Sequence, residues 1–349
     1  MNNYYISFNA EQDYTAWYKA TVDVEFFLNS IDFTPIPIKL CIENMKHCLK
    51  THMKKGNDLI DTGIILIQYP RAILEGFDLD KLIKIIKSDY RNYKLVALVH
   101  DLDSVRFGNF FLTNYLPEAR ILNKFDYLIT VNDSMADLLK QHGVTADITS
   151  MIIFDYALPN INYSQGTYNP NNISIAYAGN LKYKKSPFIY KLDKVNWGEI
   201  KINLYGPEIN LNKIGLWKNI NYKGAFPADD LGSLMREDFG LCWDGSNIDK
   251  CEGKIGQYLK YTNPHKTSFY LALGIPVIIS KDISTAEFIE KEHAGITIDK
   301  LQSIPSVINQ LSIEEYNLLK ENAQKISEKL REGYFLKNTI TKIEQFINS

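Results

Sequence analysis

The chain has 349 residues, with 39 Lys and Arg against 41 Asp and Glu, which gives a formal net charge of −2. Hydrophobic residues make up 45% and charged residues 23%, so the composition is that of a globular protein and excludes disorder throughout the chain. The near-neutral charge argues against a protein that binds nucleic acid through bulk positive charge. The length favours two domains.

Short β-rich runs alternate with helical patterns through the first half of the chain. Strands are expected at Tyr4–Ser7, Ile36–Leu40, Ile64–Gln68, Lys94–Val99 and Tyr127–Val131, and helices at Thr15–Asn29, Leu79–Lys87 and Ser134–His142. Ile64–Ile67 and Leu95–Val99 are continuously apolar, which is typical of parallel strands covered on both faces. Strand–helix alternation of this kind predicts a doubly wound α/β domain.

The segment Leu158–Asn172 is rich in Asn, Pro, Gly and Ser, so we interpret it as a linker, with the domains joined near residue 165. The alternation then restarts, with strands expected at Ile173–Tyr177, Lys201–Tyr205, Phe239–Trp243 and Pro276–Ile279 and a helical tail over Ser312–Ser349 that breaks near Gly333. The chain therefore predicts two Rossmann-like domains, residues 1–160 and 170–334.

Ligands of open parallel sheets bind at the carboxyl ends of the strands, where loops and helix N-termini converge, so the residues that follow each strand are candidates. His100, Asp101 and Asp103 follow the strand Lys94–Val99. They could supply a general base, or the carboxylates could cap a helix and His100 could only be packed. Position alone does not choose between these interpretations.

Two further strand ends carry residues that suit a nucleotide. After Ile173–Tyr177 come Gly179 and the lysines of LKYKKSP, although without the spacing of a P-loop or a GxGxxG motif. After Lys201–Tyr205 comes Gly206-Pro207-Glu208, which could line a nucleotide pocket or be only a turn.

The densest group of candidates lies between Phe239 and Ile279. The first strand there ends at Trp243 and Asp244, and the run NPHKTS leads into a helix expected at Phe269–Leu273. Asn263 followed by Pro264 is typical of a helix start. Free amides at such a start, beside Lys266, predict an anion site that favours a diphosphate. We favour this over an ordinary capped helix.

The four cysteines form no CxxC pair and no zinc-site spacing with His, so we expect no structural metal. Cys41 and Cys48 lie two helical turns apart on one expected helix, which fits buried thiols. The start of the chain lacks a basic region followed by an apolar run, and no apolar run reaches the roughly 20 residues of a membrane helix. We therefore expect a cytoplasmic, reduced protein.

The run FGLCWDGSNIDKCEGKIGQYLKYTNPHKTSFYLALGIPVII resembles the donor-domain signature of bacterial β-1,6-galactofuranosyltransferases. These are related to the third glucosyltransferase of serine-rich-repeat adhesin glycosylation. The runs AWYKATVDVEFFL, KLVALVHDLDSVRF, AYAGNLKYKKSPFIYKL and INLYGPE also match, in order and along most of the chain. The resemblance implies a GT-B fold, with an acceptor-side domain first, a UDP-sugar domain second, and a C-terminal helix at about residues 335–349 that crosses back to the first domain.

The resemblance also implies a site that binds a UDP-sugar without a metal or further cofactor. Lys266 would hold the diphosphate with the amides of Thr267 and Ser268, and Asn180 with Lys182 or Lys184 would line the donor phosphates. The adhesin-pathway relatives have Arg in that loop, so a lysine point charge would replace a bidentate contact here. Residues expected around the uridine and the sugar are Tyr205, Gly206, Trp243, Asp244, Asn263 and His265.

The resemblance leads us to expect inverting transfer of a hexose, foremost galactofuranose from UDP-galactofuranose in a β-1,6 linkage, to a sugar hydroxyl in bacterial surface polysaccharide synthesis. Asp101 is the expected base, with His100 and Asp103 as alternates. The donor could instead be UDP-glucose or UDP-N-acetylglucosamine, extending O-linked N-acetylglucosamine on an adhesin. A non-catalytic nucleotide-sugar-binding protein or a non-hydrolysing epimerase would share the two-domain α/β architecture.

The expected partners follow from the same resemblance. The acceptor would be a lipid-linked oligosaccharide or a glycoprotein, and no nucleic acid is expected. The family resemblance implies a homo-oligomer. A lipid-linked acceptor would bring the protein to the inner face of the membrane, although no segment has a strongly basic amphipathic face.

Overall fold

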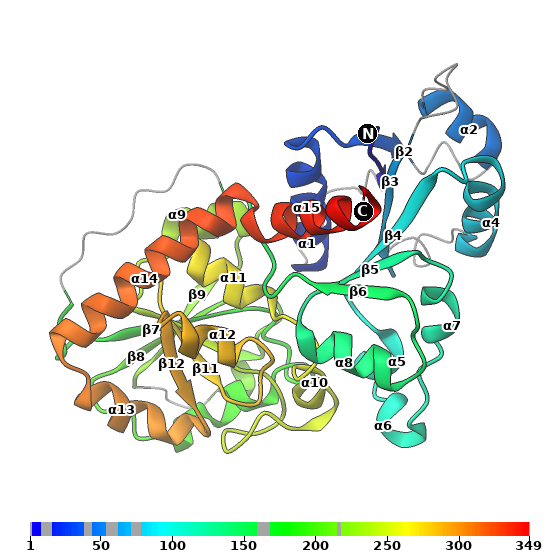
Figure 1. Ribbon diagram of the computed structural model, residues 1–349. Helices are drawn as coiled ribbons and strands as arrows, with labels where there is room; N and C mark the ends of the chain where they lie inside the picture. The colour runs from blue at the N-terminus through cyan, green and yellow to red at the C-terminus, as the bar shows by residue number, and fades with distance from the viewer. Residues whose placement is uncertain are drawn as a thin grey trace. The chain divides into compact units, whose positions relative to one another are not determined.

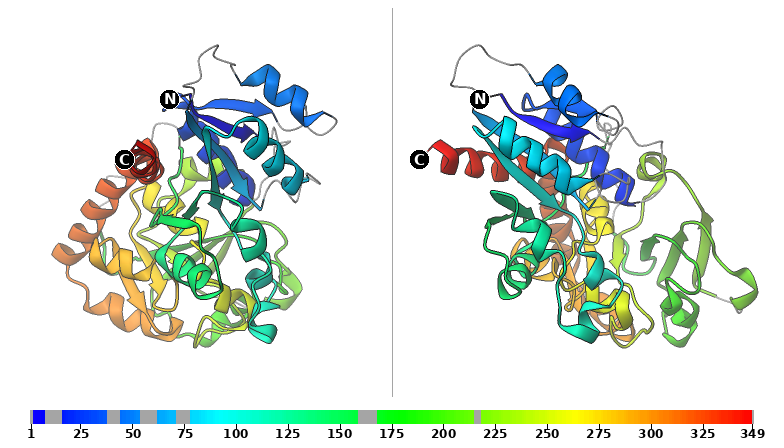
Figure 2. Two further views of the ribbon diagram at one scale, coloured as in Figure 1. Left: turned by 45° about the vertical axis from the view of Figure 1, so that its right-hand side comes forward. Right: turned by 90° about the vertical axis from the view of Figure 1, so that its right-hand side faces the viewer.

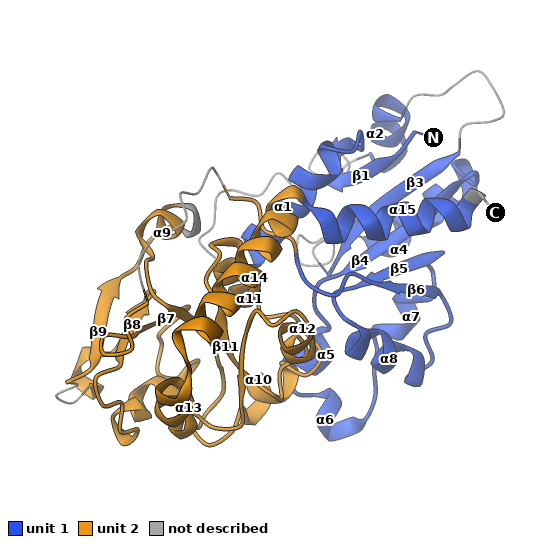
Figure 3. Ribbon diagram, turned by 60° about the vertical axis from the view of Figure 1, so that its left-hand side comes forward, with its two compact units in different colours: residues 1–154, 333–349 blue, residues 155–332 orange. Residues whose placement is uncertain are grey.

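The computed structural model describes residues 2–7, 16–37, 44–53, 62–70, 78–158, 168–214 and 218–348. The chain divides into two compact units, coloured separately in Figure 3. Unit 1 consists of Met1–Phe154 together with Gly333–Ser349, and unit 2 of Asp155–Glu332. Unit 1 is therefore built from both ends of the chain, and unit 2 from one continuous stretch.

Unit 1 contains a six-stranded parallel sheet in the order β2-β1-β3-β4-β5-β6 (Figure 1). Its elements in chain order are β1 (Tyr4–Ser7), α1 (Ala16–Asn29), β2 (Thr34–Pro37), α2 (Met45–His52), β3 (Gly63–Tyr69), α4 (Leu79–Asp89), β4 (Tyr93–Val99), α5 (Asp103–Arg106), α6 (Phe110–Thr113), α7 (Ala119–Leu122), β5 (Tyr127–Thr130), α8 (Asp133–Gln141), β6 (Asp147–Ser150) and α15 (Tyr334–Asn348). The strand order reverses between β1 and β3, which is where a doubly wound sheet opens a crevice at its carboxyl edge.

The core of unit 1 lies on its two central strands. Every residue of Ile64–Ile67 and of Leu95–Val99 is 0% exposed, as the continuous apolar runs predict. Burying each Ile, Leu or Val side chain contributes roughly 1.5–3 kcal/mol, so these two strands hold the sheet together. In Figures 1 and 2, α1 and α15 lie on one side of the strands and α4 on the other.

Helix α15 joins unit 1 because it packs against α1 and β6. It is separated from α14 by Gly333, which has a φ of 74°. A Cβ atom there would lie 2.4 Å from the Phe27 ring of α1, so only glycine permits this close turn. The break near Gly333 is thus confirmed, with helices on both sides of it.

Unit 2 contains a second six-stranded parallel sheet in the order β12-β11-β10-β7-β8-β9. Its elements in chain order are β7 (Ser174–Ala178), η2 (Pro187–Lys194), β8 (Lys201–Tyr205), η3 (Leu211–Lys213), β9 (Ile220–Gly224), α9 (Ala228–Leu234), β10 (Phe239–Cys242), α10 (Gly253–Tyr258), α11 (His265–Ala272), β11 (Val277–Ser280), α12 (Ala286–Lys291), β12 (Gly295–Ile298), η4 (Leu301–Ser303), α13 (Ile304–Gln310) and α14 (Ile313–Glu332). Here the order reverses between β7 and β10, so the ends of these two strands mark the expected ligand crevice.

Three strands are missing from the sequence prediction, and each lies at the edge of a sheet. They are β6, β9 and β12. None is fully buried, since β6 has no buried residue, β9 has one and β12 has one. An edge strand half open to solvent lacks the continuous apolar run by which the central strands are found. Of the predicted linker Leu158–Asn172, residues 159–167 lie outside the described residues.

Three further details differ from the prediction. Cys48 is disulfide-bonded, so the expectation of a thiol there is wrong, and Cys41 lies outside the described residues. Helix α11 begins at His265 rather than Phe269, and α10 is a further helix that the sequence prediction did not include. In the described part of the chain, no helix is long and apolar enough to cross a lipid bilayer.

Gly240 in β10 gives a test of how tightly unit 2 is packed. A Cβ atom at this position would lie 2.2 Å from the Tyr270 ring, and both residues are buried. Because the ring cannot shift without disturbing its neighbours, Gly240→Ala should lower the free energy of unfolding by about 1–3 kcal/mol. Denaturant unfolding of the two proteins measures the difference.

Gly232→Ala in α9 is the matched control. Its Cβ would first meet the flexible end of Leu273, 3.3 Å away, and alanine favours a helix over glycine. This variant should be as stable as the original chain or slightly more stable. A Gly240→Ala protein that unfolds at the same denaturant concentration as the control would refute tight packing at β10.

Candidate functional site

A buried ion pair joins the ends of the two central strands of unit 2. The Lys266 Nζ atom, at the start of α11, lies 2.7 Å from Asp244 Oδ2, just beyond β10. It also donates to the Tyr177 hydroxyl of β7 at 3.1 Å, and Tyr177 donates to Asp244 Oδ1 at 2.9 Å. The three side chains thus form a closed cluster at the point where the strand order reverses.

The cluster is shielded from water, because the Lys266 and Asp244 side chains are only 13% and 17% exposed. Burial alone would lower the pKa of Lys266, but the neighbouring Asp244 carboxylate outweighs it and the pKa is raised overall. Lys266 therefore remains an ammonium. Its longest contact, 3.4 Å to the Trp243 carbonyl oxygen, is the one that a phosphate oxygen could most readily replace.

The loop after β7 carries a second charged group. The Asn180 Nδ2 atom donates to Glu208 Oε1 at 2.6 Å, and the Lys182 Nζ atom lies 2.6 Å from Glu208 Oε2. Lys184 is exposed and is not part of this group. Asn180 and Lys182 are thus brought together by the carboxylate of the Gly206-Pro207-Glu208 turn, which the sequence prediction considered either for a nucleotide pocket or as only a turn.

The Asn180 loop and the Lys266 cluster are connected through one serine. The Ser186 Oγ atom donates to the Asn180 carbonyl oxygen at 2.9 Å and lies 3.3 Å from the Tyr177 hydroxyl. Gly206 lets the next loop approach, because its φ is 144° and a Cβ there would lie 1.7 Å from the Gly179 carbonyl oxygen. Sequence reasoning identified Gly206 but not Tyr177, which looks like an ordinary strand residue.

The start of α11 differs in detail from the predicted anion site. Pro264 caps the helix without a side-chain bond, so Asn263 is not the cap. The Thr267 amide donates to the Pro264 carbonyl at 2.8 Å, and the Thr267 hydroxyl to the Cys242 sulfur. In this structure the Thr267 amide therefore already donates to a backbone acceptor and is not available to a phosphate. Ser268 is 0% exposed, and its hydroxyl has no hydrogen-bond partner in the described part of the chain.

Four other predicted residues are held by contacts within unit 2. The Trp243 indole is 0% exposed and donates to the Asn247 carbonyl oxygen, so it packs inside the unit instead of facing a sugar. Tyr205 is 6% exposed and donates to Glu237. The Asn263 amide oxygen accepts from Ser284, and the His265 ring packs on Tyr156 with centroids 4.9 Å apart. Burial in the unit makes Trp243 and Tyr205 packing residues here.

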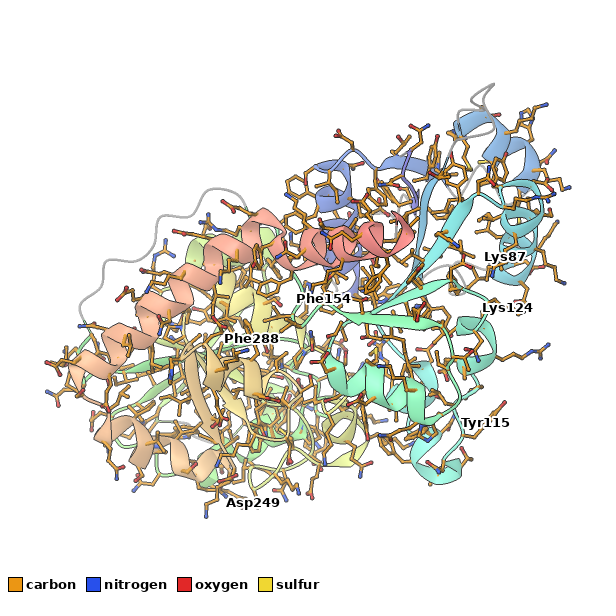
Figure 4. All side chains as sticks on the ribbon, viewed as in Figure 1. Lys87, Tyr115, Lys124, Phe154, Asp249 and Phe288 are labelled. Carbon is orange, nitrogen blue, oxygen red and sulfur yellow. The ribbon has the colours of Figure 1, made fainter. Side chains whose placement is uncertain are left out.

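In unit 1, two of the candidate bases after β4 have firm partners. His100 is 3% exposed, its Nε2 atom lies 2.7 Å from Gln68 Oε1, and its ring stacks on Phe154, which Figure 4 labels. Asp101 accepts from the Arg106 guanidinium at 3.1 Å. Asp103, the first residue of α5, is half-buried.

Glu118 is a buried carboxylate beside this loop that the sequence prediction missed. It is 6% exposed and accepts from both the amide and the hydroxyl of Ser104, at 2.7 Å each. No sequence signal marks it, since it lies 14 residues beyond its partner. Within the described residues, no group of three or more His, Cys, Asp or Glu side chains is arranged to hold a metal ion.

Comparison with known proteins finds matching family models and similar relatives. The model of the N-terminal domain of glucosyltransferase 3-like proteins matches residues 3–153, and the model of their C-terminal domain matches residues 175–343. The β-1,6-galactofuranosyltransferase WbbI of Escherichia coli K12 is 30% identical over 253 residues, 72% of this chain and 71% of WbbI. Glucosyltransferase 3 of Streptococcus gordonii is 28% identical over 254 residues, 71% and 70% of the two chains.

A solved structure shares the fold. The crystal structure of Anabaena HepE in complex with UDP and glucose aligns with a TM-score of 0.58 at 13% identity, over 100% of this chain and 99% of HepE. The two parallel sheets and these likenesses define a glycosyltransferase of the GT-B fold class. The chain belongs to the glucosyltransferase 3-like family. The predicted family, GT-B fold and hexosyltransferase class are thereby confirmed.

The Lys266–Asp244 pair should show strong coupling in a double-mutant cycle. Lys266→Met leaves the buried Asp244 carboxylate without its cation, and Asp244→Asn leaves the buried Lys266 ammonium without its anion. Each single variant should therefore lower the free energy of unfolding by about 3 kcal/mol. The double variant leaves neither charge, and its loss should be smaller than the sum by at least about 1 kcal/mol. Denaturant unfolding of all four proteins gives the coupling.

Lys281 and Asp299 form the matched surface pair, with side chains 54% and 77% exposed. Because water and salt screen such a pair, the same cycle there should give a coupling below about 1 kcal/mol. Equal coupling at the two pairs would contradict the buried character of the Lys266 cluster.

Proposed function

We propose that this protein transfers a hexose from a UDP-sugar to a hydroxyl of an acceptor sugar, with galactofuranose from UDP-galactofuranose as the donor and a β-1,6 linkage as the product. The buried Lys266–Asp244–Tyr177 cluster at the β7/β10 reversal carries the proposal. It holds the Lys266 ammonium, paired with Asp244, at the strand ends where this sheet type binds nucleotides. The WbbI likeness supports galactofuranose as the sugar and β-1,6 as the linkage. We propose bacterial surface polysaccharide synthesis as the pathway from the family resemblance.

The proposed donor site uses charge to hold the diphosphate. Lys266 at the start of α11 and Lys182 beside Asn180 supply ammonium groups on loops that Ser186 connects. As the bond between C1 and the phosphate oxygen breaks, UDP leaves with the electron pair and its negative charge grows. Fixed cations stabilise that charge without reorganising, which is how such sites lower a barrier. This chemistry requires no metal, in keeping with the metal independence that we propose.

The acceptor side of the reaction requires a base. An inverting transfer forms the new bond from the acceptor oxygen to C1 on the face opposite UDP, and the hydroxyl proton passes to a protein group. We assign this role to the loop His100–Asp103 of unit 1. The acceptor class, a lipid-linked oligosaccharide or a glycoprotein, follows from the family resemblance, and the homo-oligomer stays a prediction.

A second donor has an observation in its favour. The S. gordonii relative and both family models carry the name glucosyltransferase 3, and the former is nearly as similar as WbbI. UDP-glucose, or UDP-N-acetylglucosamine, would then be transferred to a glycosylated serine-rich protein. Galactofuranose and these sugars differ in ring size, so direct comparison separates the donors.

The donor experiment compares UDP, UDP-galactofuranose, UDP-galactopyranose, UDP-glucose and UDP-N-acetylglucosamine by calorimetry, followed by transfer assays with and without EDTA. We expect UDP to bind, UDP-galactofuranose to be the best donor and EDTA to leave the rate unchanged. Tightest binding and turnover of UDP-glucose would favour the second donor. A chain that does not bind UDP at all would refute the proposed function.

Lys182 and Lys184 can be separated by substitution. Lys182 and Asn180 both contact the Glu208 carboxylate, so Lys182 is held beside the predicted phosphate position. Lys182→Ala should therefore weaken UDP binding about 10-fold, the effect of losing one charge-assisted hydrogen bond of about 1.5 kcal/mol. Lys184→Ala is the matched control on the same loop and should change the affinity less than about twofold. The opposite ranking in calorimetry would assign the phosphate contact to Lys184.

A further inference from the structure

Three candidate bases follow β4, and their surroundings set them apart. The imidazole of His100 is enclosed between Gln68 and Phe154 and is 3% exposed, which keeps it from a substrate in this structure. The carboxylate of Asp101 is neutralised by the Arg106 guanidinium at 3.1 Å. A carboxylate that a guanidinium already holds is fixed in direction and must give up that contact to reach a substrate hydroxyl.

Asp103 has the opposite surroundings. Its carboxylate makes no hydrogen bond or ion pair within the described part of the chain, and it is half-buried. Burial first, and then the negative charge of Asp101, raise the pKa of Asp103; Arg106 opposes this and Glu118 adds to it. A carboxylate with a raised pKa holds a proton more strongly, which suits a general base near neutral pH.

A residue outside α5 holds the first turn of that helix in place through hydrogen bonds. Its N-cap residue is Leu102, which has no side chain able to cap. Glu118 replaces the missing cap: its two oxygens accept from the Ser104 amide and the Ser104 hydroxyl, both at 2.7 Å. Because Ser104 follows Asp103 directly, this clamp fixes the backbone that carries the Asp103 carboxylate.

The end of β3 belongs to the same group. Tyr69 is 4% exposed, and its pKa is raised by burial and then by the charges of Glu118 and Asp103. The phenol therefore stays protonated. Thus Tyr69 from β3, Asp103 from α5 and Glu118 from the start of α7 converge at the carboxyl edge of the sheet of unit 1.

We propose that Asp103 is the proton acceptor of the transfer and that Glu118 positions it by clamping the first turn of α5. The acceptor hydroxyl oxygen forms its bond to C1 of the donor sugar as the bond from C1 to the UDP oxygen breaks. UDP takes the electron pair, and the hydroxyl proton passes to the Asp103 carboxylate, which later releases it to water. This assignment rests on the proposed function and deepens it.

The first experiment compares Asp103→Asn with Asp101→Asn, both of which keep the size of the side chain. Asp103→Asn should lower kcat at least about 100-fold, the usual effect of a lost general base, and leave UDP affinity unchanged. Asp101→Asn should lower kcat less than about 10-fold, because Asp101 is not assigned the proton transfer. A loss in Asp101→Asn equal to or greater than that in Asp103→Asn overturns the assignment.

The second experiment tests the positioning role through the pH dependence of kcat. Glu118→Gln keeps an oxygen for the Ser104 amide but removes a negative charge that faces Asp103, along with Asp101, Arg106 and the neutral Tyr69. The pKa of Asp103 should fall, so the acidic limb of the profile should move to lower pH. Glu118→Ala, which removes the clamp, should lower kcat further with little change in KM for the donor.

Asp126→Asn is the matched control, since Asp126 accepts from the Leu95 amide at 2.7 Å near the amino end of β4, away from the loop. Its acidic limb should coincide with that of the original chain. An unmoved limb in Glu118→Gln, or an equal shift in the control, overturns the role of Glu118.

These results are distinguishable from a failure of the proposed function. If NMR of the product shows a retained anomeric configuration, both the inverting mechanism and the base are refuted. If the original chain inverts and Asp103→Asn keeps its rate, only the assignment of Asp103 fails.

Discussion

The contact between the Lys266 ammonium and the Asp244 carboxylate organises the candidate donor site. An unpaired ammonium at 13% exposure would be costly, whereas a paired one is tolerated and stays charged. Since Asp244 follows β10, Lys266 lies in the first turn of α11 and Tyr177 near the end of β7, the cluster around this ion pair links three elements. The Asn180 loop is then tied to this cluster through Ser186.

The two units handle buried carboxylates by different means. Asp244 in unit 2 is balanced by a cation, so its charge is nearly cancelled where it lies. Glu118 in unit 1 is instead satisfied by one amide and one hydroxyl, both from Ser104, which hydrogen-bond the charge without cancelling it. The negative field therefore persists in the loop after β4, and a proton is held there more strongly. The transfer that we propose would use both conditions, a cation for the leaving group and a retained anion for the proton.

Much of this fold could be predicted from sequence because the central strands are apolar throughout. The runs at Ile64–Ile67 and Leu95–Val99 are fully buried, and the helix expected between them forms as α4. The edge strands β6, β9 and β12 escaped prediction because solvent reaches one or both of their faces. Local sequence thus reports the interior of a sheet better than its margins.

The candidate site was predictable only where the type of a residue by itself indicates its chemistry. Lys266, Asp244 and Asn180 stand in polar runs after strands, and the structure brings Lys266 and Asp244 together. Trp243, from the same run, was expected around the uridine and the sugar, yet its ring lies in the interior of unit 2. Tyr177 and Glu118 carry no local signal, because their roles depend on partners brought near only by folding.

The membership of α15 in unit 1 has a consequence for biosynthesis. Unit 2 is complete in one continuous stretch, but α1 and β6 must wait until α15 has been translated before they gain its cover. The unit whose synthesis starts first is thus finished last, against the usual order in which domains fold as they emerge from the ribosome. Until α15 has emerged, the surface of unit 1 that it covers is open to chaperones, so premature termination shortly after Gly333 would harm the unit that was translated first.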